Sequence, residues 1–203
     1  MSSVLTSTGP RVKDYDVNAF APVDDSLRGQ LTEWAAIRKF MLAGNARFTL
    51  RNNKTGMRYT YQVKAKKEEL QAAQLRAEHK RADNSNSDPT LPDIDVTYFV
   101  SLLRGSDNVA DYKYLGVLRK PGTFYITPAS RLHRSSPSVR ALVWFLDVMR
   151  LERTGLGKTL EFWHEGRCAK CGRALTVPKS INDAAFNGGY GPECAKYFGG
   201  GGA

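Results

Sequence analysis

All three cysteines of this 203-residue chain lie near its C-terminus, and their spacing restricts how that part can fold. Cys168 and Cys171 form a C-x2-C pair, a spacing that lets one tight turn present two sulfurs to a single metal ion, and Gly172 permits the turn. Tetrahedral zinc needs four ligands, and Cys194 and His164 are the nearest further candidates. We therefore predict a closed, structural zinc site with one histidine and three cysteine ligands, His164, Cys168, Cys171 and Cys194.

A lone C-x2-C pair can also be a redox centre, so the surroundings of Cys168 and Cys171 decide between the two chemistries. A thioredoxin-like pair is expected where a strand meets a helix within a βαβ unit, and no such pattern surrounds this pair. The odd number of cysteines also argues against a complete disulfide framework. Zinc is therefore the favoured cofactor.

Short segments of alternating apolar and polar residues, separated by tight turns, dominate the middle of the chain. Such alternation is typical of strands with one buried face. The clearest example is 58–64, which follows the turn-rich residues 52–56. We predict an antiparallel sheet of about five strands, at residues 48–51, 58–64, 96–103, 112–118 and 123–127.

Two segments instead have apolar residues at helical spacing, at 31–43 and 137–151. The second begins with a Ser-Pro pair, a favourable N-cap followed by a favourable first helical residue. We expect both helices to pack against the sheet and to bury Trp34 and Trp144 there. The predicted fold class is therefore α+β, with two main helices on the sheet and a small C-terminal zinc finger.

Composition divides the chain into three parts. Residues 1–28 lack periodicity and are predicted to be an irregular N-terminal arm. Residues 29–153 form the α+β domain, with an exposed insertion at 66–95 that joins a charged helical segment to a polar loop. That helix is either a solvated face or an arm that binds a partner. The zinc-binding finger is predicted to span 160–198.

The C-terminal motif resembles a known family. Residues 168–181 read CAKCGRALTVPKSI and residues 189–194 read GYGPEC, with a longer spacer between them than the family pattern has. The pattern is CxxCGRxLTxPxSI…GxGPxC, which belongs to a cysteine-rich zinc-finger domain of unknown function, widespread in bacteriophage and bacterial proteins. The resemblance covers about residues 164–196. It implies a phage or prophage origin and a zinc finger, and it implies no settled activity.

The chain has a formal net charge of +10. The excess lies in the strand-rich segments, because residues 29–65 hold seven basic residues and one acidic, and residues 96–162 hold ten basic and five acidic. This distribution favours a nucleic-acid partner, although a soluble protein with a solvated basic face has the same composition. No apolar run is long enough for a membrane helix and no secretory signal opens the sequence, so we expect a cytoplasmic protein, in the host cell if a phage encodes it.

Aromatic and basic residues alternate on the predicted strands, an arrangement that single-stranded nucleic acid requires for base stacking and phosphate contacts. Tyr59 and Tyr61 are the candidate stacking residues, but the same alternation equally suits packing in the core. The candidate phosphate contacts are Arg58, Lys64, Lys113, Arg119, Lys120, Arg131, Arg134, Arg167 and Arg173.

Taken together, these features predict a phage-type, zinc-binding protein that binds nucleic acid, with a preference for single strands of DNA or RNA. The alternative is an interaction protein that inhibits a host nuclease or defence complex, since a basic surface serves either role. The sequence has no nucleophile paired with a base and no clustered carboxylates of the kind used by two-metal nucleases. We therefore predict that the protein is not an enzyme.

Overall fold

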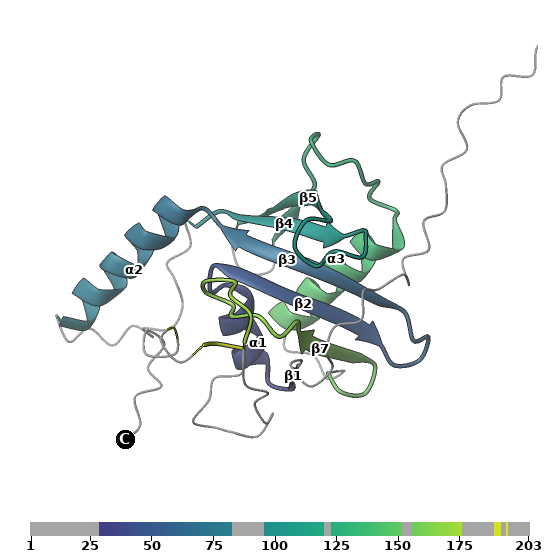
Figure 1. The fold of residues 1–203 in the computed structure, drawn as a ribbon, viewed down its shortest axis with the longest axis horizontal. Helices are drawn as coiled ribbons and strands as arrows, with labels where there is room; N and C mark the ends of the chain where they lie inside the picture. The colour runs from purple at the N-terminus through teal and green to yellow at the C-terminus, as the bar shows by residue number, and fades with distance from the viewer. Residues whose placement is uncertain are drawn as a thin grey trace, which may run out of the picture.

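A hairpin of two eight-residue strands lies at the centre of the structure, a computed structural model that describes residues 29–82, 96–119, 123–151, 156–175, 189–191 and 194. Seven antiparallel strands form one sheet in the order β1-β7-β2-β3-β4-β5-β6 (Figure 1). The strands are β1 (Gly29–Leu31), β2 (Asn45–Asn52), β3 (Arg58–Ala65), β4 (Tyr98–Leu103), β5 (Tyr112–Leu118), β6 (Phe124–Tyr125) and β7 (Leu160–His164). The helices are α1 (Trp34–Met41), α2 (Lys67–Ala82) and α3 (Pro137–Arg150).

The antiparallel sheet and the α+β class are confirmed, but the strand count differs from the prediction of about five. The two additional strands are β1 and β7. β1 has only three residues, one of which (Leu31) the sequence assigned to the first helix, and β7 lies in the segment assigned to the finger. Because β7 pairs with β2 on one side and β1 on the other, the segment that leads to the cysteines is part of the sheet.

One face of the sheet is covered by α1 and α3, which lie behind it in Figure 1. Aromatic rings fill this contact. Phe48 of β2 stacks on Phe162 of β7 with ring centroids 4.6 Å apart, and Phe145 of α3 lies 5.7 Å from Phe162. All three rings are fully buried, so the helix-covered face holds the main core.

The two tryptophans differ from the prediction that both are buried against the sheet. Trp34 is half-buried and its ring lies 6.3 Å from that of Phe145. Trp144 is 43% exposed, because its neighbour Phe145 occupies the inward position on α3. Of the apolar residues at helical spacing in this segment, Val139, Leu142, Leu146 and Met149 are buried as expected, whereas Val143 is 40% exposed.

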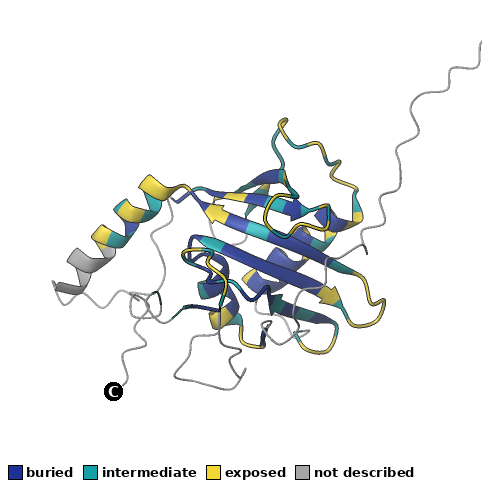
Figure 2. Ribbon diagram, viewed as in Figure 1, coloured by how far each residue is buried: buried dark blue, intermediate teal, exposed yellow. Residues whose placement is uncertain are grey.

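α2 leaves the sheet after β3 and extends away from the body of the molecule (Figures 1 and 2). Among its described side chains, Ala73 is buried and Leu75 is 57% exposed. Its first turn is held to the sheet by Glu69, whose carboxylate accepts a hydrogen bond from the N–H of Thr97 (2.7 Å). No helix in the described part of the chain is long and apolar enough to cross a bilayer. The predicted arm (1–28) and the loop of the predicted insertion (83–95) lie outside the described residues.

The other side of the sheet, which we call the open face, is covered by none of the described helices. Two loops lie over part of it, residues 104–111 between β4 and β5 and residues 166–175 after β7 (Figure 1). The rest of this face is formed by alternate residues of β2 to β6. It is therefore the largest part of the sheet that lacks a helical cover in the described structure.

Candidate functional site

A narrow loop that follows β7 carries the C-x2-C pair, and we call residues 166–175 the cysteine loop. At its tip the N–H of Gly172 donates a hydrogen bond to the carbonyl of Cys168 (2.8 Å). Gly172 has a φ of +77°, and a Cβ on it would come within 2.3 Å of the Asn45 side chain. Glycine is required here both for the turn and for the close approach to β2.

The sulfurs of Cys168, Cys171 and Cys194 all lie within 4.8 Å of one another, although Cys194 is more than twenty residues further along the chain. Cys168 is buried, Cys194 is half-buried and Cys171 is exposed. With metal–sulfur bonds of about 2.3 Å, tetrahedral geometry places sulfurs about 4 Å apart. The three thiols could therefore hold one metal ion, and all three are among the ligands predicted from the sequence.

The backbone around the thiols favours the charged form of one of them. Burial acts to raise the pKa of Cys168, but hydrogen bonds from the N–H groups of Cys171, Gly191 and Lys170 and from the Cys171 thiol outweigh it and lower that pKa. Burial, and then the neighbouring Cys168, raise the pKa of Cys194 to about 12. Without a cation, the group thus stabilises one thiolate and opposes a second, and a bound cation would offset this repulsion.

His164, the predicted fourth ligand, does not belong to this group of thiols. Its ring is buried on the helix-covered face, 5.9 Å from the ring of Phe40. Its Nδ1 accepts a hydrogen bond from the N–H of Gly166 (3.2 Å), and its Nε2 faces Gly29, where a Cβ would come within 2.2 Å. Burial lowers the pKa of His164 to about 4. The ligand set is therefore corrected to the three cysteines within the described residues, and His164 is a neutral core residue.

Glu165 anchors the cysteine loop to the open face. Its side chain is 3% exposed, and its carboxylate accepts hydrogen bonds from the Thr49 hydroxyl and from the side-chain amide of Asn108 (3.2 Å). The hydroxyls of Thr49 and Thr60 lie 2.6 Å apart, so Thr60 donates to Thr49 while Thr49 donates to Glu165. This network joins the cysteine loop to β2, β3 and the loop between β4 and β5.

The same thiol group is held to α1 on its other side. The N–H of Ala169 donates to the carbonyl of Gly189 (2.9 Å), which brings the segment before Cys194 beside the cysteine loop. Tyr190 is 1% exposed, and its hydroxyl donates to the carbonyl of Lys39 at the C-terminal end of α1 (2.9 Å). The cluster of thiols is thus fastened to elements on both faces of the sheet.

Neither of the predicted stacking residues is available to a nucleic acid. Tyr61 is fully buried and its hydroxyl donates a hydrogen bond to the carbonyl of Ser138 at the start of α3 (2.7 Å). Tyr59 is 7% exposed and points to the same covered face as its cross-strand partner Leu50. The prediction that these rings stack on bases is wrong. Alternate side chains of β3 point to opposite faces of the sheet, and Tyr59 and Tyr61 are on the face that the helices cover.

The predicted phosphate contacts lie on several surfaces. Lys64 is exposed on the open face, and Arg119 is exposed directly after β5. Lys113 and Arg131 meet at a pocket, described below. The others do not form one cluster with these: Arg58 is half-buried at the far end of β3, Arg134 is exposed before α3, Arg167 (half-buried) and Arg173 (exposed) lie on the cysteine loop, and Lys120 is outside the described residues.

The open face carries an aromatic and basic row that the sequence analysis missed. Five residues are cross-strand neighbours in succession from β2 to β6: Asn45, Lys64, Phe99, Val117 and Tyr125. Phe99 is 41% exposed and Tyr125 is 50% exposed, unusual values for large aromatic side chains on a sheet. We call these residues the open-face row. The signal was present in the sequence, since Phe99 alternates with the buried Tyr98 and Val100.

Comparison with known protein families finds a similarity in the C-terminal part of the chain. Residues 159–199 are similar to a family of unknown function (DUF6011), and this segment contains β7 and all three cysteines. No curated protein and no solved structure matches the chain.

Proposed function

We propose that the protein binds single-stranded nucleic acid on its open face. The observation that carries this proposal is the open-face row, in which two exposed aromatic rings lie two strand spacings apart, about 10 Å. Bases stack on exposed rings without regard to sequence, and cations beside the rings bind the phosphates. Lys64 is the neighbour of Phe99 in the row and supplies such a cation.

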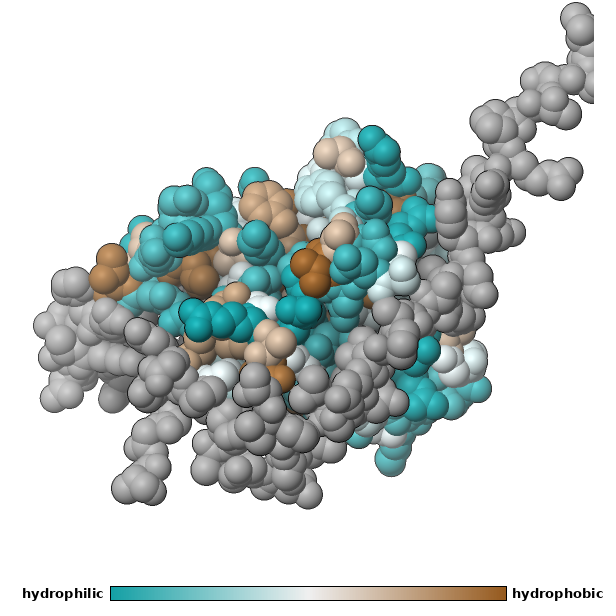
Figure 3. All heavy atoms as spheres, viewed as in Figure 1, coloured by the Kyte–Doolittle hydropathy of each residue, from teal (hydrophilic) through white to brown (hydrophobic). Residues whose placement is uncertain are grey.

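The surface around the row fits this use. Gln62 and Ser101 lie beside the row on the same face and offer hydrogen-bonding groups for a base edge or a ribose hydroxyl. In Figure 3, brown and tan patches interrupt the hydrophilic surface on this side of the molecule. Single strands expose the faces of their bases, whereas duplexes do not. A row of exposed rings on a sheet therefore favours binding of single strands over duplexes.

The test is a fluorescence-anisotropy titration with labelled single- and double-stranded oligonucleotides. Phe99→Ala and Tyr125→Ala should each weaken single-strand binding by about 1–3 kcal/mol, the contribution of one stacked base. Trp144→Ala is the matched control, because Trp144 is equally exposed (43%) but lies on α3, behind the sheet. Wild-type affinity in both row variants would refute the proposal.

We further propose that the cysteine cluster holds a structural zinc ion. Its three cysteine thiolates are soft ligands of the kind zinc prefers in structural sites, and the metal would fasten the cysteine loop to Cys194. Protein purified without chelators should contain about one zinc per chain by elemental analysis. Cys171→Ser should lose that zinc, whereas His164→Asn should retain it. Loss of zinc from His164→Asn with wild-type stability would instead restore His164 as a ligand.

A second candidate function is the binding of a host protein. Val143 and Trp144 on α3 and Leu151 directly after it are large apolar residues that are 40%, 43% and 46% exposed, and exposed apolar residues of this kind can contact a partner. The motif resemblance to phage proteins makes a nuclease or defence complex the partner class to examine first. Under this function, Trp144→Ala would abolish inhibition of the host activity while the row variants would not.

A further inference from the structure

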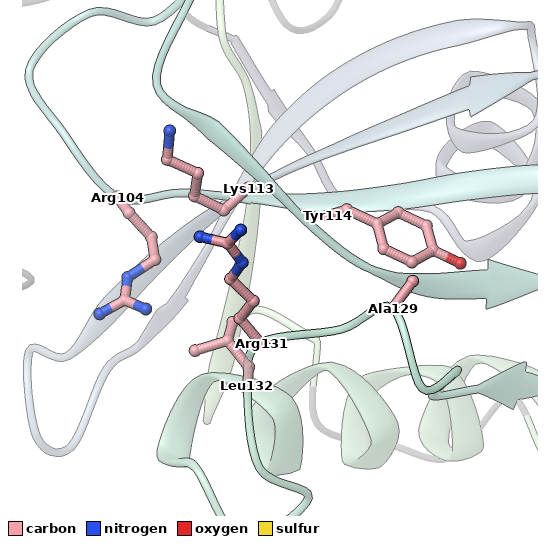
Figure 4. Close-up of a pocket in the computed structure, with 6 residues that line it drawn as sticks. All are labelled: Arg104, Lys113, Tyr114, Ala129, Arg131 and Leu132. Atoms are coloured by element: carbon pink, nitrogen blue, oxygen red, sulfur yellow. The ribbon is translucent and has the colours of Figure 1, made fainter.

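A basic pocket lies between β5 and the loop that joins β6 to α3. It has a volume of about 600 Å³, within the range of small-molecule sites. Figure 4 shows Arg131 extending from its loop towards β5, beside the stem of Lys113, with Arg104 on the neighbouring segment. The remaining described lining residues are Tyr114, Ala129 and Leu132, so none of the described residues of the lining is acidic.

A β-bulge directs Lys113 into this pocket. The pairing of β4 with β5 shifts between Val100, which faces Gly116, and Ser101, which faces Tyr114. The extra residue on β5 reverses the alternation, so Lys113 becomes the partner of the buried Leu102. Without the bulge, position 113 would lie on the open face. The strand therefore departs from regular geometry at the point where it supplies a cation to the pocket.

The wall of the pocket that faces β5 is the loop of residues 127–132, which hydrogen bonds hold in place. The hydroxyl of Thr127 donates to the hydroxyl of Tyr114 (3.0 Å), which ties the loop to β5. The N–H of Ser130 donates to the carbonyl of Thr127 (2.9 Å), and the N–H of Leu132 donates to the hydroxyl of Ser130 (3.2 Å). Arg131 is thereby fixed between two short turns, with its backbone arranged before any ligand arrives.

Two of the charged groups in the pocket have no counterion among the described residues. Within the described residues no carboxylate forms an ion pair with Lys113 or Arg131. Groups of like charge that line one pocket repel each other, and an anion bound between them would reduce that repulsion. Two guanidinium groups and an ammonium are the donors that proteins use for phosphate oxygens. The aromatic and aliphatic side chains of Tyr114 and Leu132 add an apolar wall next to these donors.

We propose that this pocket binds one nucleotide unit, with its phosphate between Arg104, Lys113 and Arg131 and its base or sugar against Tyr114 and Leu132. The inference goes beyond the proposed function, because none of the residues that line the pocket belongs to the open-face row. The nucleotide can be a free mononucleotide or the phosphorylated end of a nucleic-acid strand. Both present the same chemistry to the pocket.

Isothermal titration of the full chain with AMP, adenosine and pyrophosphate tests the proposal. AMP should bind with a Kd below about 1 mM, pyrophosphate should compete, and adenosine should not bind measurably, because the phosphate supplies the charge-assisted contacts. Arg131→Ala should weaken AMP binding by about tenfold or more. Arg134→Ala is the matched control, since Arg134 is an exposed arginine three residues away that does not line the pocket. Its affinity for AMP should equal that of the wild type.

A 5′-phosphorylated and a 5′-hydroxyl oligonucleotide of the same sequence separate the two sources of the nucleotide. If the ligand is a strand end, the phosphorylated strand binds more tightly and Arg131→Ala removes the difference. If the ligand is a free mononucleotide, only AMP responds to Arg131→Ala. Phe99→Ala should leave AMP binding unchanged, so failure of the open-face proposal is distinguishable from failure of this one. Absence of AMP and pyrophosphate binding, or equal losses in Arg131→Ala and Arg134→Ala, would overturn the proposal.

Discussion

The two faces of the sheet are built from the same strands and carry opposite surfaces. On the helix-covered face, Phe48, Tyr61 and Phe162 are fully buried beneath α1 and α3. On the open face, Phe99 and Tyr125 keep 41% and 50% of their surface exposed, and no described helix covers them. Aromatic residues thus serve the core on one face and remain exposed on the other. The difference shows that the cover of a face, and not the residue type, decides what an aromatic side chain on a strand does.

Truncating one ring on each face tests whether the two faces differ in solution as they do in the structure. Phe48→Ala should lower the free energy of unfolding by about 3–5 kcal/mol, because it leaves a cavity among Tyr61, Phe145 and Phe162. Phe99→Ala should change it by less than about 1 kcal/mol, since much of that ring already contacts water. Urea denaturation of both variants measures the contrast. Equal losses would show that the open face is covered in solution.

A second prediction concerns the histidine on the covered face. Burial lowers the pKa of His164 to about 4, against about 6.5 in an unfolded chain. The unfolded state therefore binds the proton first, and stability that is present above pH 6.5 is lost as the pH falls towards 4. The loss attributable to His164 should be about 3 kcal/mol. His164→Asn, which keeps an acceptor for the N–H of Gly166, should show a correspondingly smaller loss.

Chemical denaturation at several pH values between about 4 and 7 provides that measurement. Metal binding by cysteine ligands weakens as the pH falls, so the wild type and His164→Asn must be compared at matched zinc content. The difference between the two curves isolates the histidine. Parallel curves would mean that His164 is accessible to water in solution and does not belong to the core.

Local patterns were sufficient to predict much of the fold. The apolar stripe of 137–151 identifies α3, and the alternation in 58–64 identifies β3, because each depends on residues that are close in sequence. β1 and β7 could not be predicted in the same way. Each is stabilised by pairing across more than one hundred residues, and the short β1 has little pattern of its own.

The candidate sites were less predictable, for two physical reasons. Alternation assigns residues to two faces but does not say which face the helices cover, so Tyr61 and Phe99 could not be told apart from sequence. Nearness in sequence also misled the choice of a metal ligand. His164 is four residues from Cys168, but the strand directs its ring into the core. The motif correctly predicted that the three cysteines come together. For Cys168 and Cys171 this was possible because a C-x2-C turn is a local structure.

The smallest effect is expected at Lys64, the basic residue of the open-face row. Lys64→Gln removes the one cation of the open-face row, so the slope of log K against log salt for single strands should become shallower by about 0.7, the value for one phosphate contact. Because phosphate contacts carry no sequence information, affinity should fall by a similar factor for every oligonucleotide tested. Lys54→Gln, in the exposed turn between β2 and β3, removes the same charge from a site away from the row and should leave the slope unchanged. Anisotropy titrations from low to moderate salt measure both slopes. Equal changes in the two variants would mean that binding depends on net charge, and the open face would then have no special part in it.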